Sequence, residues 1–426
     1  MKKNRFLALV LFSIFIWLGI NHFILNDNFI AKPNNYLDEN LDDFELRLKI
    51  EVETHNLIRE NIKQLNYSSH EDSYQFNEHS SSNSSSVAIL VIACNRPSIS
   101  RCINKLLKYR KSKDEFPIIV SQDCIHERTS QVIKSFGREL IHIHQPDQKE
   151  IKVPSKEKKF SGYFKISRHY KWALNQVFNT YNYETAIIVE DDLDVAPDFY
   201  EYFKATLPIL QKDETLWCVS AWNDNGKFAL IDRNDPKLLY RSDFFPGLGW
   251  MLTRKIWIEL MHKWPHSYWD DWMRHPDQRK GRSCIRPELS RTKTFGKIGV
   301  SNGLFYEKHL KYIYLNELPV DFTKLNLTYL LKNEYDNNFV EMVYKTPLVS
   351  INELKNKQIN HSDPVRIIYY TKNNLKSLTK LFGLMDDFKS GVPRTAYKGI
   401  ISFTYDNRRV YLAPVKEWHN YDPSWQ

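Results

Sequence analysis

Three consecutive carboxylates, Glu190, Asp191 and Asp192, directly follow the apolar run at residues 186–189. Like charges at the end of a buried strand destabilise the fold unless a cation neutralises them. Carboxylate oxygens suit Mg²⁺ or Mn²⁺, which commonly bridge a carboxylate to the phosphates of a substrate. The competing interpretation is an acidic turn whose last aspartate caps a helix near Pro197. The three acids alone leave both interpretations open.

Polar side chains follow two other apolar runs. Arg96 comes shortly after the run at 87–93, and Asp123 comes shortly after the run at 116–120. A guanidinium suits a phosphate, and an aspartate accepts hydrogen bonds from a uracil or a ribose. Ligands of open parallel sheets bind outside the carboxyl ends of the strands, so we expect these side chains near the acidic triplet. The sequence therefore predicts a metal-dependent nucleotide-sugar site.

A second chemical group is the run Ser-Tyr-Trp-Asp-Asp-Trp at 267–272. Aromatic rings pack on the apolar faces of sugars, and a carboxylate binds sugar hydroxyls or removes a proton. In the alternative interpretation, Trp269 and Trp272 lie three residues apart on a helix and belong to the core. The run is therefore a candidate sugar site with a structural alternative.

Glycine is scarce, with 13 in 426 residues, and six of them lie between residues 247 and 303. Gly296, Gly299 and Gly303 predict a mobile segment at 296–310 that closes as a lid over a bound donor. An irregular loop is the alternative.

The elements that must position these residues are buried strands alternating with helices. This alternation favours a parallel α/β sheet. We predict a Rossmann-like catalytic domain at 87–315 and a small C-terminal α+β domain at 330–426, with a hairpin at 399–413 turning at Asp406-Asn407. The apolar runs that predict the strands are 87–93, 116–120, 140–143 and 186–189, and a long helix is predicted from about 162 to 181.

The composition is that of an ordered globular protein. Hydrophobic residues make up 42% and charged residues 26% of the chain, which excludes the disordered and fibrous classes. Lys and Arg number 60 against 51 Asp and Glu, a net charge of +9, but the basic residues are scattered. Scattered positive charge does not indicate nucleic-acid binding, and no nucleic-acid partner is predicted.

The N-terminus predicts a membrane anchor followed by a stem. Residues 1–5 are basic, and residues 6–26 carry no formal charge, which is long enough to cross a bilayer. The basic flank places the N-terminus in the cytosol. A cleaved signal peptide is the alternative, but no Ala-x-Ala pattern follows. Residues 27–86 are expected to form a lumenal stem, whose interrupted helical stripe makes it a candidate for self-association.

Five longer segments of the sequence carry a resemblance to a known family: IVEDDLDVAPDF (188–199), LWCVSAWNDNG (216–226), FFPGLGW (244–250), WDDWMR (269–274) and DPSW (422–425). Segments of this length are far more specific than an acidic triplet. With them, the sequence from Val87 to Gln426 resembles the alpha-1,3-mannosyl-glycoprotein 2-beta-N-acetylglucosaminyltransferase family, the N-acetylglucosaminyltransferase I family of the Golgi. The stem before Val87 carries no such resemblance.

The resemblance implies a GT-A fold, UDP-GlcNAc as donor and Mn²⁺ as cofactor. It implies inverting transfer in β1,2 linkage to the α1,3-linked mannose of high-mannose N-glycans, which starts hybrid and complex N-glycan synthesis. By motif position, Asp192 is implied as the metal ligand and Asp270 as the general base for the mannose 2-hydroxyl. The implied donor-binding residues are Arg96, Asp123, His169, Glu190, Asp191, Trp269 and Ser301.

Five cysteines fit an oxidising lumen. Cys94 and Cys124 follow strands that are expected to be neighbours, so a disulfide between them is geometrically reasonable. The resemblance implies this bridge, a second between Cys218 and Cys284, and a free Cys102. It also implies a single-pass type II protein of the Golgi membrane with a lumenal catalytic body.

Two other functions compete with this interpretation. A related enzyme adds GlcNAc β1,2 to O-linked mannose on protein, but it is expected to carry a folded carbohydrate-binding module in its stem. A glycan-binding protein without activity on the same fold would have lost the acids. Glu190, Asp191, Asp192 and Asp270 are all present.

Overall fold

The computed structural model describes residues 86–297, 299–300, 303, 305–359 and 363–425. They belong to one compact unit, Ser82–Gln426. The predicted tail, anchor and stem lie outside the described residues, apart from residue 86. Within the described part of the chain, no helix is both long and apolar enough to cross a membrane.

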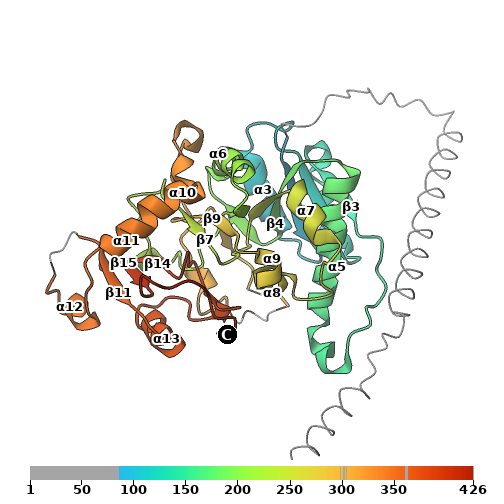
Figure 1. Ribbon diagram of the computed structural model, residues 1–426. Helices are drawn as coiled ribbons and strands as arrows, with labels where there is room; N and C mark the ends of the chain where they lie inside the picture. The colour runs from blue at the N-terminus through green and yellow to red at the C-terminus, as the bar shows by residue number, and fades with distance from the viewer. Residues whose placement is uncertain (1–85, 298, 301–302, 304, 360–362, 426) are drawn as a thin grey trace, which may run out of the picture. The chain divides into compact units, whose positions relative to one another are not determined.

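An eight-stranded sheet forms the centre of this unit, in the order β3-β2-β1-β4-β8-β6-β9-β7 (Figure 1). β3, β2, β1 and β4 pair in parallel, which confirms the α/β prediction. β8 is antiparallel to β4 and β6, β9 is parallel to β6, and β7 is antiparallel to β9. The bounds are β1 (Ala88–Ala93), β2 (Ile118–Gln122), β3 (Ile141–His144), β4 (Thr185–Glu190), β6 (Leu216–Ser220), β7 (Leu239–Ser242), β8 (Trp250–Thr253) and β9 (Ser283–Pro287).

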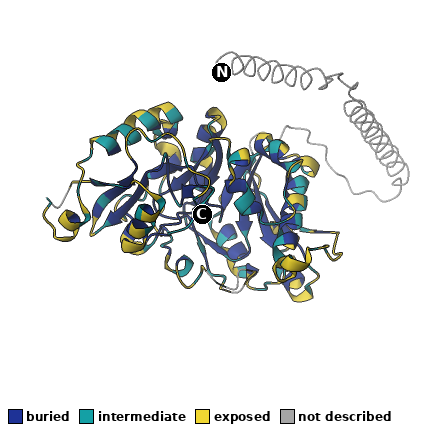
Figure 2. Ribbon diagram, turned by 60° about the horizontal axis from the view of Figure 1, so that its bottom comes forward, coloured by how far each residue is buried: buried dark blue, intermediate teal, exposed yellow. Residues whose placement is uncertain are grey.

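Both faces of the sheet are buried, which explains why its strands read as continuous apolar runs. In β1, Ile89 and Val91 face one core cluster, and Leu90 and Ile92 face the other. Figure 2 shows this buried interior in dark blue. Helices α3 (Ile99–Tyr109), α4 (Glu127–Lys134) and α6 (Phe199–Lys212) pack on the first face, and α5 (Ser161–Asn175) and α7 (Arg254–Met261) pack on the second.

The parallel register brings three strand ends to one edge of the sheet. Ala93 pairs with Gln122, and Ile92 pairs with Glu190. The polar residues that follow β1, β2 and β4 therefore emerge side by side. The predicted long helix has its α-helical part in α5 and then continues as a π-helix, Gln176–Thr180.

The C-terminal part has its own three-stranded sheet, β11-β15-β14, and a core cluster that also includes Leu230 and Phe244. The predicted hairpin is confirmed, since β14 and β15 are antiparallel and both turn residues, Asp406 and Asn407, have positive φ. The remaining bounds are β5 (Leu193–Val195), α8 (Trp269–Arg274), α9 (Pro276–Arg279), β10 (Thr292–Thr294), α10 (Lys332–Tyr335), α11 (Glu341–Lys345), α12 (Ile351–Lys355), β11 (Val365–Ile368), α13 (Lys372–Leu381), β12 (Phe388–Lys389), β13 (Val392–Pro393), β14 (Ile401–Tyr405) and β15 (Arg408–Ala413).

Candidate active site

The three acids at the end of β4 point to different partners. The Tyr170 hydroxyl donates to Oε1 of Glu190 at 2.8 Å. Nε of Arg96 lies 2.9 Å from Oδ1 of Asp191, and its Nη2 lies 3.4 Å from Oδ2 of Asp192. The structure thus brings Arg96 and the acidic triplet together, as the strand-end argument predicts.

These carboxylates are held at an electrostatic cost. Burial, with the charge of Asp192 adding to it, raises the pKa of Glu190 to about 7. Burial also raises the pKa of Asp191 to about 7, although Arg96 opposes the shift. The pKa of Asp192 is raised by burial as well. A positive charge at this strand end would therefore stabilise the ionised cluster.

The acidic-turn interpretation does not describe these residues. The last aspartate, Asp194, accepts a 2.8 Å hydrogen bond from Nε of Arg101 rather than capping a helix. Asp198 occupies the N-cap position of α6 but makes no side-chain cap bond there. It receives a 3.0 Å hydrogen bond from Nη2 of Arg291 instead. No helix-capping bond therefore accounts for the acidic run, and the cation-binding interpretation of Glu190, Asp191 and Asp192 is the one that is kept.

Asp192 has the chemistry of a ligand for Mg²⁺ or Mn²⁺. In the part of the chain that the structure describes, no three His, Cys, Asp or Glu side chains form a ready metal cage. These ions need no such cage, because they bind one or two carboxylates and the phosphates of a substrate. The Asp192 side chain is 16% exposed, and a lone carboxylate open to a nucleotide suits this mode.

The predicted lid segment begins against Asp192. A Cβ at position 296 would collide with the Asp192 carboxylate, so only glycine allows the backbone to pass there. Phe295 N–H also donates to the Asp192 backbone carbonyl at 2.9 Å. Closure of the segment stays a prediction, and Ser301 lies outside the described residues.

The end of β2 carries Asp123 and lies beside His169 of α5. Nε2 of His169 is 2.8 Å from Oγ of Ser121, and burial lowers the pKa of this histidine to about 4, so it is neutral at physiological pH. Asp123 is buried, and its Oδ1 accepts a 3.1 Å hydrogen bond from Gln148. A neutral imidazole beside a buried carboxylate is suited to uncharged hydrogen-bonding groups such as those of a nucleoside.

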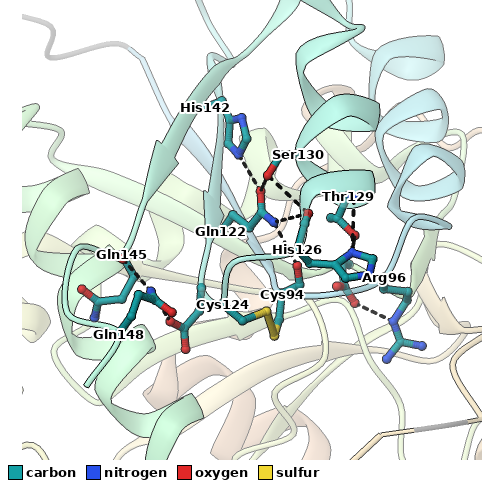
Figure 3. The surroundings of a disulfide bond; sticks show 12 residues. Cys94, Arg96, Gln122, Cys124, His126, Thr129, Ser130, His142, Gln145 and Gln148 are labelled. Carbon is teal, nitrogen blue, oxygen red and sulfur yellow. Dashed lines mark hydrogen bonds and ion pairs between the residues drawn. A yellow bond between two sulfur atoms is a disulfide. The ribbon is translucent and has the colours of Figure 1, made fainter. Parts of the chain in front are cut away.

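Disulfides hold two pairs of neighbouring strands, in the pairing that the resemblance implies. Cys94 and Cys124 join the ends of β1 and β2, with a Cα–Cα distance of 5.4 Å (Figure 3). Cys218 and Cys284 join β6 to β9, with a Cα–Cα distance of 4.6 Å. Cys102 is free and buried. The first bridge fixes the strand ends that carry Arg96 and Asp123.

An aromatic stack links the acidic triplet to α8. Tyr170, the partner of Glu190, stacks on Trp269 with ring centres 4.3 Å apart. Trp250 and Trp264 lie 5.8 Å from the same ring, which is only 8% exposed. Trp269 is thus a core residue on a helix, as the structural alternative predicts, and its contact with a donor stays a prediction. The stack places Asp270 next to the acidic strand end.

Asp270 and Asp271 begin α8 and share a cation. Nη1 of Arg274 donates to Oδ2 of Asp270 and to Oδ1 of Asp271, both at 2.8 Å. Lys389 donates to Oδ2 of Asp271, also at 2.8 Å. Burial opposes ionisation, but Arg274 and Lys389 hold the pKa of Asp270 below its usual value. Asp270 is therefore a carboxylate at neutral pH, and its side chain is 44% exposed.

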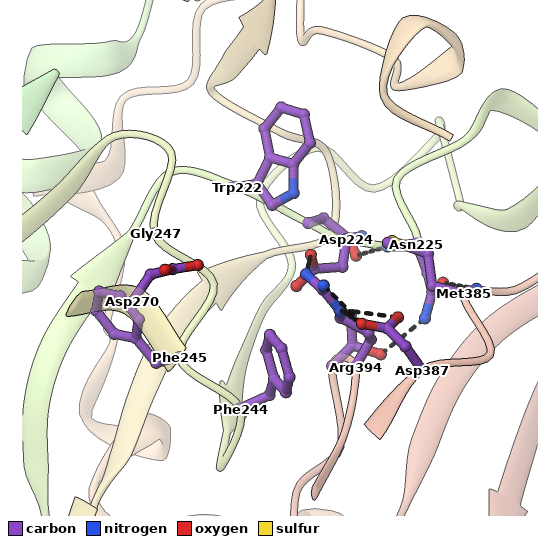
Figure 4. Close-up of polar contacts among 12 residues, drawn as sticks. Trp222, Asp224, Asn225, Phe244, Phe245, Gly247, Asp270, Met385, Asp387 and Arg394 are labelled. Atoms are coloured by element: carbon purple, nitrogen blue, oxygen red, sulfur yellow. Dashed lines mark hydrogen bonds and ion pairs between the residues drawn. The ribbon is translucent and has the colours of Figure 1, made fainter. Parts of the chain in front are cut away.

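The C-terminal part supports this helix through a second arginine. Arg394 donates to Asp224 and to Asp387, each at 2.7 Å (Figure 4). The guanidinium carbons of Arg274 and Arg394 lie 4.8 and 4.6 Å from the ring centre of Phe244. Two cation–π contacts with Phe244 thus connect Arg274, which binds Asp270, to Arg394 of the C-terminal part.

Sequence reasoning missed several residues of this site. Tyr170 follows His169 directly, and Arg274 lies four residues after Asp270, so helical spacing was an available signal. Lys389 reaches Asp271 across 118 residues, and nothing local in the sequence marks it. Phe244 lies in one of the segments quoted for the resemblance, but its position between two arginines depends on tertiary packing.

Two sequence comparisons with known proteins agree with each other. The chain matches the GNT-I family over residues 28–425. It is 39% identical over 328 residues to the alpha-1,3-mannosyl-glycoprotein 2-beta-N-acetylglucosaminyltransferase of Arabidopsis thaliana, a match that covers 76% of this chain and 73% of the relative. The family match begins at residue 28, so the expectation that no resemblance precedes Val87 is wrong.

Solved structures of glycosyltransferases resemble the chain more weakly. TarS of S. aureus (1–349, in complex with UDP-GlcNAc) is 13% identical, with a TM-score of 0.35, over 70% of this chain and 82% of that chain. The mannosyltransferase PcManGT of Pyrobaculum calidifontis, in complex with GDP-Man and Mn²⁺, is also 13% identical. Its TM-score is 0.28 over 40% of this chain and 46% of that chain.

Proposed function

Because the chain belongs to the GNT-I family, we propose that it transfers GlcNAc from UDP-GlcNAc, in β1,2 linkage, to the α1,3-linked mannose of a high-mannose N-glycan. The observation that carries the proposal is the contact chain from Glu190 through Tyr170 to Trp269, which places Asp270 beside the acidic strand end. A donor held at that strand end and an acceptor at Asp270 would meet there.

The donor is proposed to lie across the ends of β1, β2 and β4, as in a GT-A fold. Asp123 and His169 would bind the uridine, and Arg96 lies where a diphosphate needs positive charge. A divalent cation, proposed to be Mn²⁺, would be held by Asp192 and the diphosphate and would supply positive charge beside the departing UDP. A cation that neutralises the acidic strand end would also fit the raised pKa values of Glu190 and Asp191.

The acceptor is proposed to place its mannose 2-hydroxyl at Asp270. The Asp270 carboxylate takes the hydroxyl proton while the oxygen bonds to the anomeric carbon of GlcNAc, and the bond from that carbon to the UDP oxygen breaks. Attack opposite to the leaving group inverts the anomeric configuration. Arg274 keeps Asp270 ionised and fixes its orientation through the 2.8 Å contact.

The cellular setting is proposed from the sequence. Residues 6–26 would anchor the chain in the Golgi membrane as a type II protein, with residues 27–86 as a stem and the catalytic body in the lumen. The two disulfides of the structure are compatible with an oxidising compartment.

The proposal is tested by incubating the full-length protein with UDP-GlcNAc, Mn²⁺ and either a five-mannose N-glycan or an O-mannosyl peptide. We expect GlcNAc transfer to the N-glycan, detected by mass spectrometry. The linkage, determined by methylation analysis, should be β1,2 on the α1,3-linked mannose. Transfer only to the peptide would favour the O-mannose enzyme, and transfer to neither acceptor would overturn the proposed activity.

Replacing Lys389 with Met is expected to move the acid limb of the kcat profile to higher pH. Arg274 lowers the pKa of Asp270 most, and Lys389 adds a smaller lowering, so the variant without Lys389 protonates Asp270 at a somewhat higher pH and loses the base there. The measurement is kcat against pH at saturating substrates. Lys255→Met removes a lysine whose ion pair with Glu214 is exposed and should leave the profile unchanged. A profile of Lys389→Met identical to wild type would contradict this electrostatic role.

A further inference from the structure

Three aromatic side chains form a cluster beside Asp270 that the proposed chemistry does not use. The ring centres of Tyr163 and Tyr268 lie 4.8 Å apart. Phe160 lies 6.4 Å from Tyr163 and 6.5 Å from Tyr268. We call Phe160, Tyr163 and Tyr268 the aromatic platform. It combines the first turn of α5 and the residue before it with the residue that precedes α8.

The platform differs from the stack around Trp269 in its exposure. Phe160 is 38% exposed, and Tyr163 and Tyr268 are partly exposed, whereas Trp269 is only 8% exposed. Clustered aromatic rings that remain partly exposed at the protein surface indicate a binding surface more than a core. Among the rings near Asp270, those of the platform are therefore open to a ligand, while Trp269 and its neighbours hold the helix.

The backbone at Tyr268 is strained. Its φ is +49°, the left-handed region that side chains other than glycine rarely adopt. Such strained positions tend to occur at functional sites. The turn lets the chain place Trp269 in the buried stack while Tyr268 packs on Tyr163 at the surface.

The platform is close to the proposed base. Tyr268 is the N-cap residue of α8 and lies two positions before Asp270, and its ring packs on Tyr163. Nζ of Lys159 lies over the Phe160 ring, 4.9 Å from its centre, so it occupies one face of that ring and leaves the other face for a ligand. A ligand group that reaches Asp270 would therefore have the platform next to it.

Resting on the proposed function, we infer that the aromatic platform binds sugar residues of the acceptor glycan beyond the mannose that receives GlcNAc. The acceptor is a branched oligosaccharide, so a mannose placed at Asp270 must have further sugars within a few ångströms. Pyranose rings present apolar C–H faces that pack on aromatic rings. The open rings of Phe160 and Tyr163 offer such a surface on the solvent side of the site.

The test compares a large and a minimal acceptor on the full-length protein. Phe160→Ala and Tyr163→Ala are expected to raise KM for a five-mannose N-glycan about tenfold, the loss of one good ring contact. KM for UDP-GlcNAc and kcat/KM for methyl α-mannoside should stay at the wild-type values, because the small acceptor does not reach the platform. Phe160 is exposed, so its variant is expected to fold.

Tyr370→Ala serves as the matched control, since Tyr370 is a 68% exposed aromatic residue outside the platform, between β11 and α13. It should change no constant. If the wild type is active and both platform variants keep its KM for the N-glycan, the inference fails while the proposed function stands. An equal loss with methyl α-mannoside would also overturn it, because it would indicate a general defect. If the wild type transfers to no acceptor, the proposed function fails and the inference falls with it.

Discussion

Replacing Asp270 with Asn is expected to lower kcat for GlcNAc transfer by at least about a hundredfold, the scale of a lost general base. Asn keeps the shape of the side chain and an oxygen that accepts the 2.8 Å hydrogen bond from Arg274. It cannot take the proton of the mannose 2-hydroxyl at neutral pH. Binding of UDP-GlcNAc, measured by titration calorimetry with Mn²⁺, should be unchanged, because the donor lies at the strand ends.

The neighbouring residue provides the control for this variant. Asp271 is on the same helix, accepts from the same Nη1 of Arg274, and also binds Lys389. Asp271→Asn therefore disturbs the same ion pairs without removing the proposed base, and we expect only a severalfold decrease in kcat. If both variants lose activity equally, the ion-pair network is what matters, and Asp270 is not distinguished as the base. Wild-type turnover in Asp270→Asn would exclude it from that role.

The parallel half of the sheet could be predicted because its signals are local. Each strand is buried on both faces and therefore appears as an unbroken apolar run. The antiparallel half could not be predicted in this way. β7, for example, buries Arg241, whose guanidinium is paired with Asp213 at 2.8 Å and also donates hydrogen bonds to Leu330 and Thr215. A paired buried charge depends on a partner from elsewhere in the chain, so the run itself does not read as a buried strand.

In the candidate site, too, only the features with local sequence signals could be predicted. The meeting of Arg96 with Asp191 and Asp192 followed from strand ends that share one edge. Which aromatic rings are exposed at the site could not be predicted from the sequence, because aromatic residues near a carboxylate suit both a core and a sugar-binding surface. Packing decides between the two: Trp269 is buried, and the exposed rings belong to the aromatic platform.

The C-terminal part is joined to the proposed base by two separate routes. One runs through Lys389 and Asp271, and the other through Arg394, Phe244 and Arg274. Arg394 is itself fixed by Asp224 and Asp387. Because both routes end on α8, the position of Asp270 depends on residues more than a hundred positions away. A catalytic unit cut before β12 is therefore not expected to hold its base correctly.

Replacing Asp192 with Ala is expected to abolish Mn²⁺-dependent transfer, lowering kcat/KM by at least about a hundredfold. Asp192 is the acid whose carboxylate lies against Gly296 and beside Arg96, at the strand end proposed for the diphosphate. Loss of this side chain removes the proposed ligand while Glu190 keeps Tyr170 as its partner. Transfer would be measured over a range of Mn²⁺ concentrations, to separate weaker metal binding from loss of chemistry.

The same variant is expected to fold at least as stably as wild type in the absence of metal. Burial raises the pKa of Asp192, which means that its ionised form destabilises the folded state at neutral pH. Alanine removes that charge and its repulsion of Glu190 and Asp191. Thermal unfolding measures this: addition of Mn²⁺ in the presence of UDP should raise the Tm of wild type above its value with UDP alone and should leave the Tm of Asp192→Ala at its value with UDP alone.

Asp194→Asn is the matched control, two residues further along the chain. Asp194 is paired with Arg101, so this variant is expected to lose about 1–2 kcal/mol of unfolding free energy but to keep the rise in Tm with Mn²⁺ and UDP. The opposite pattern, in which Asp192→Ala still responds to Mn²⁺ and UDP and still transfers GlcNAc, would move the ligand role to Glu190 or Asp191.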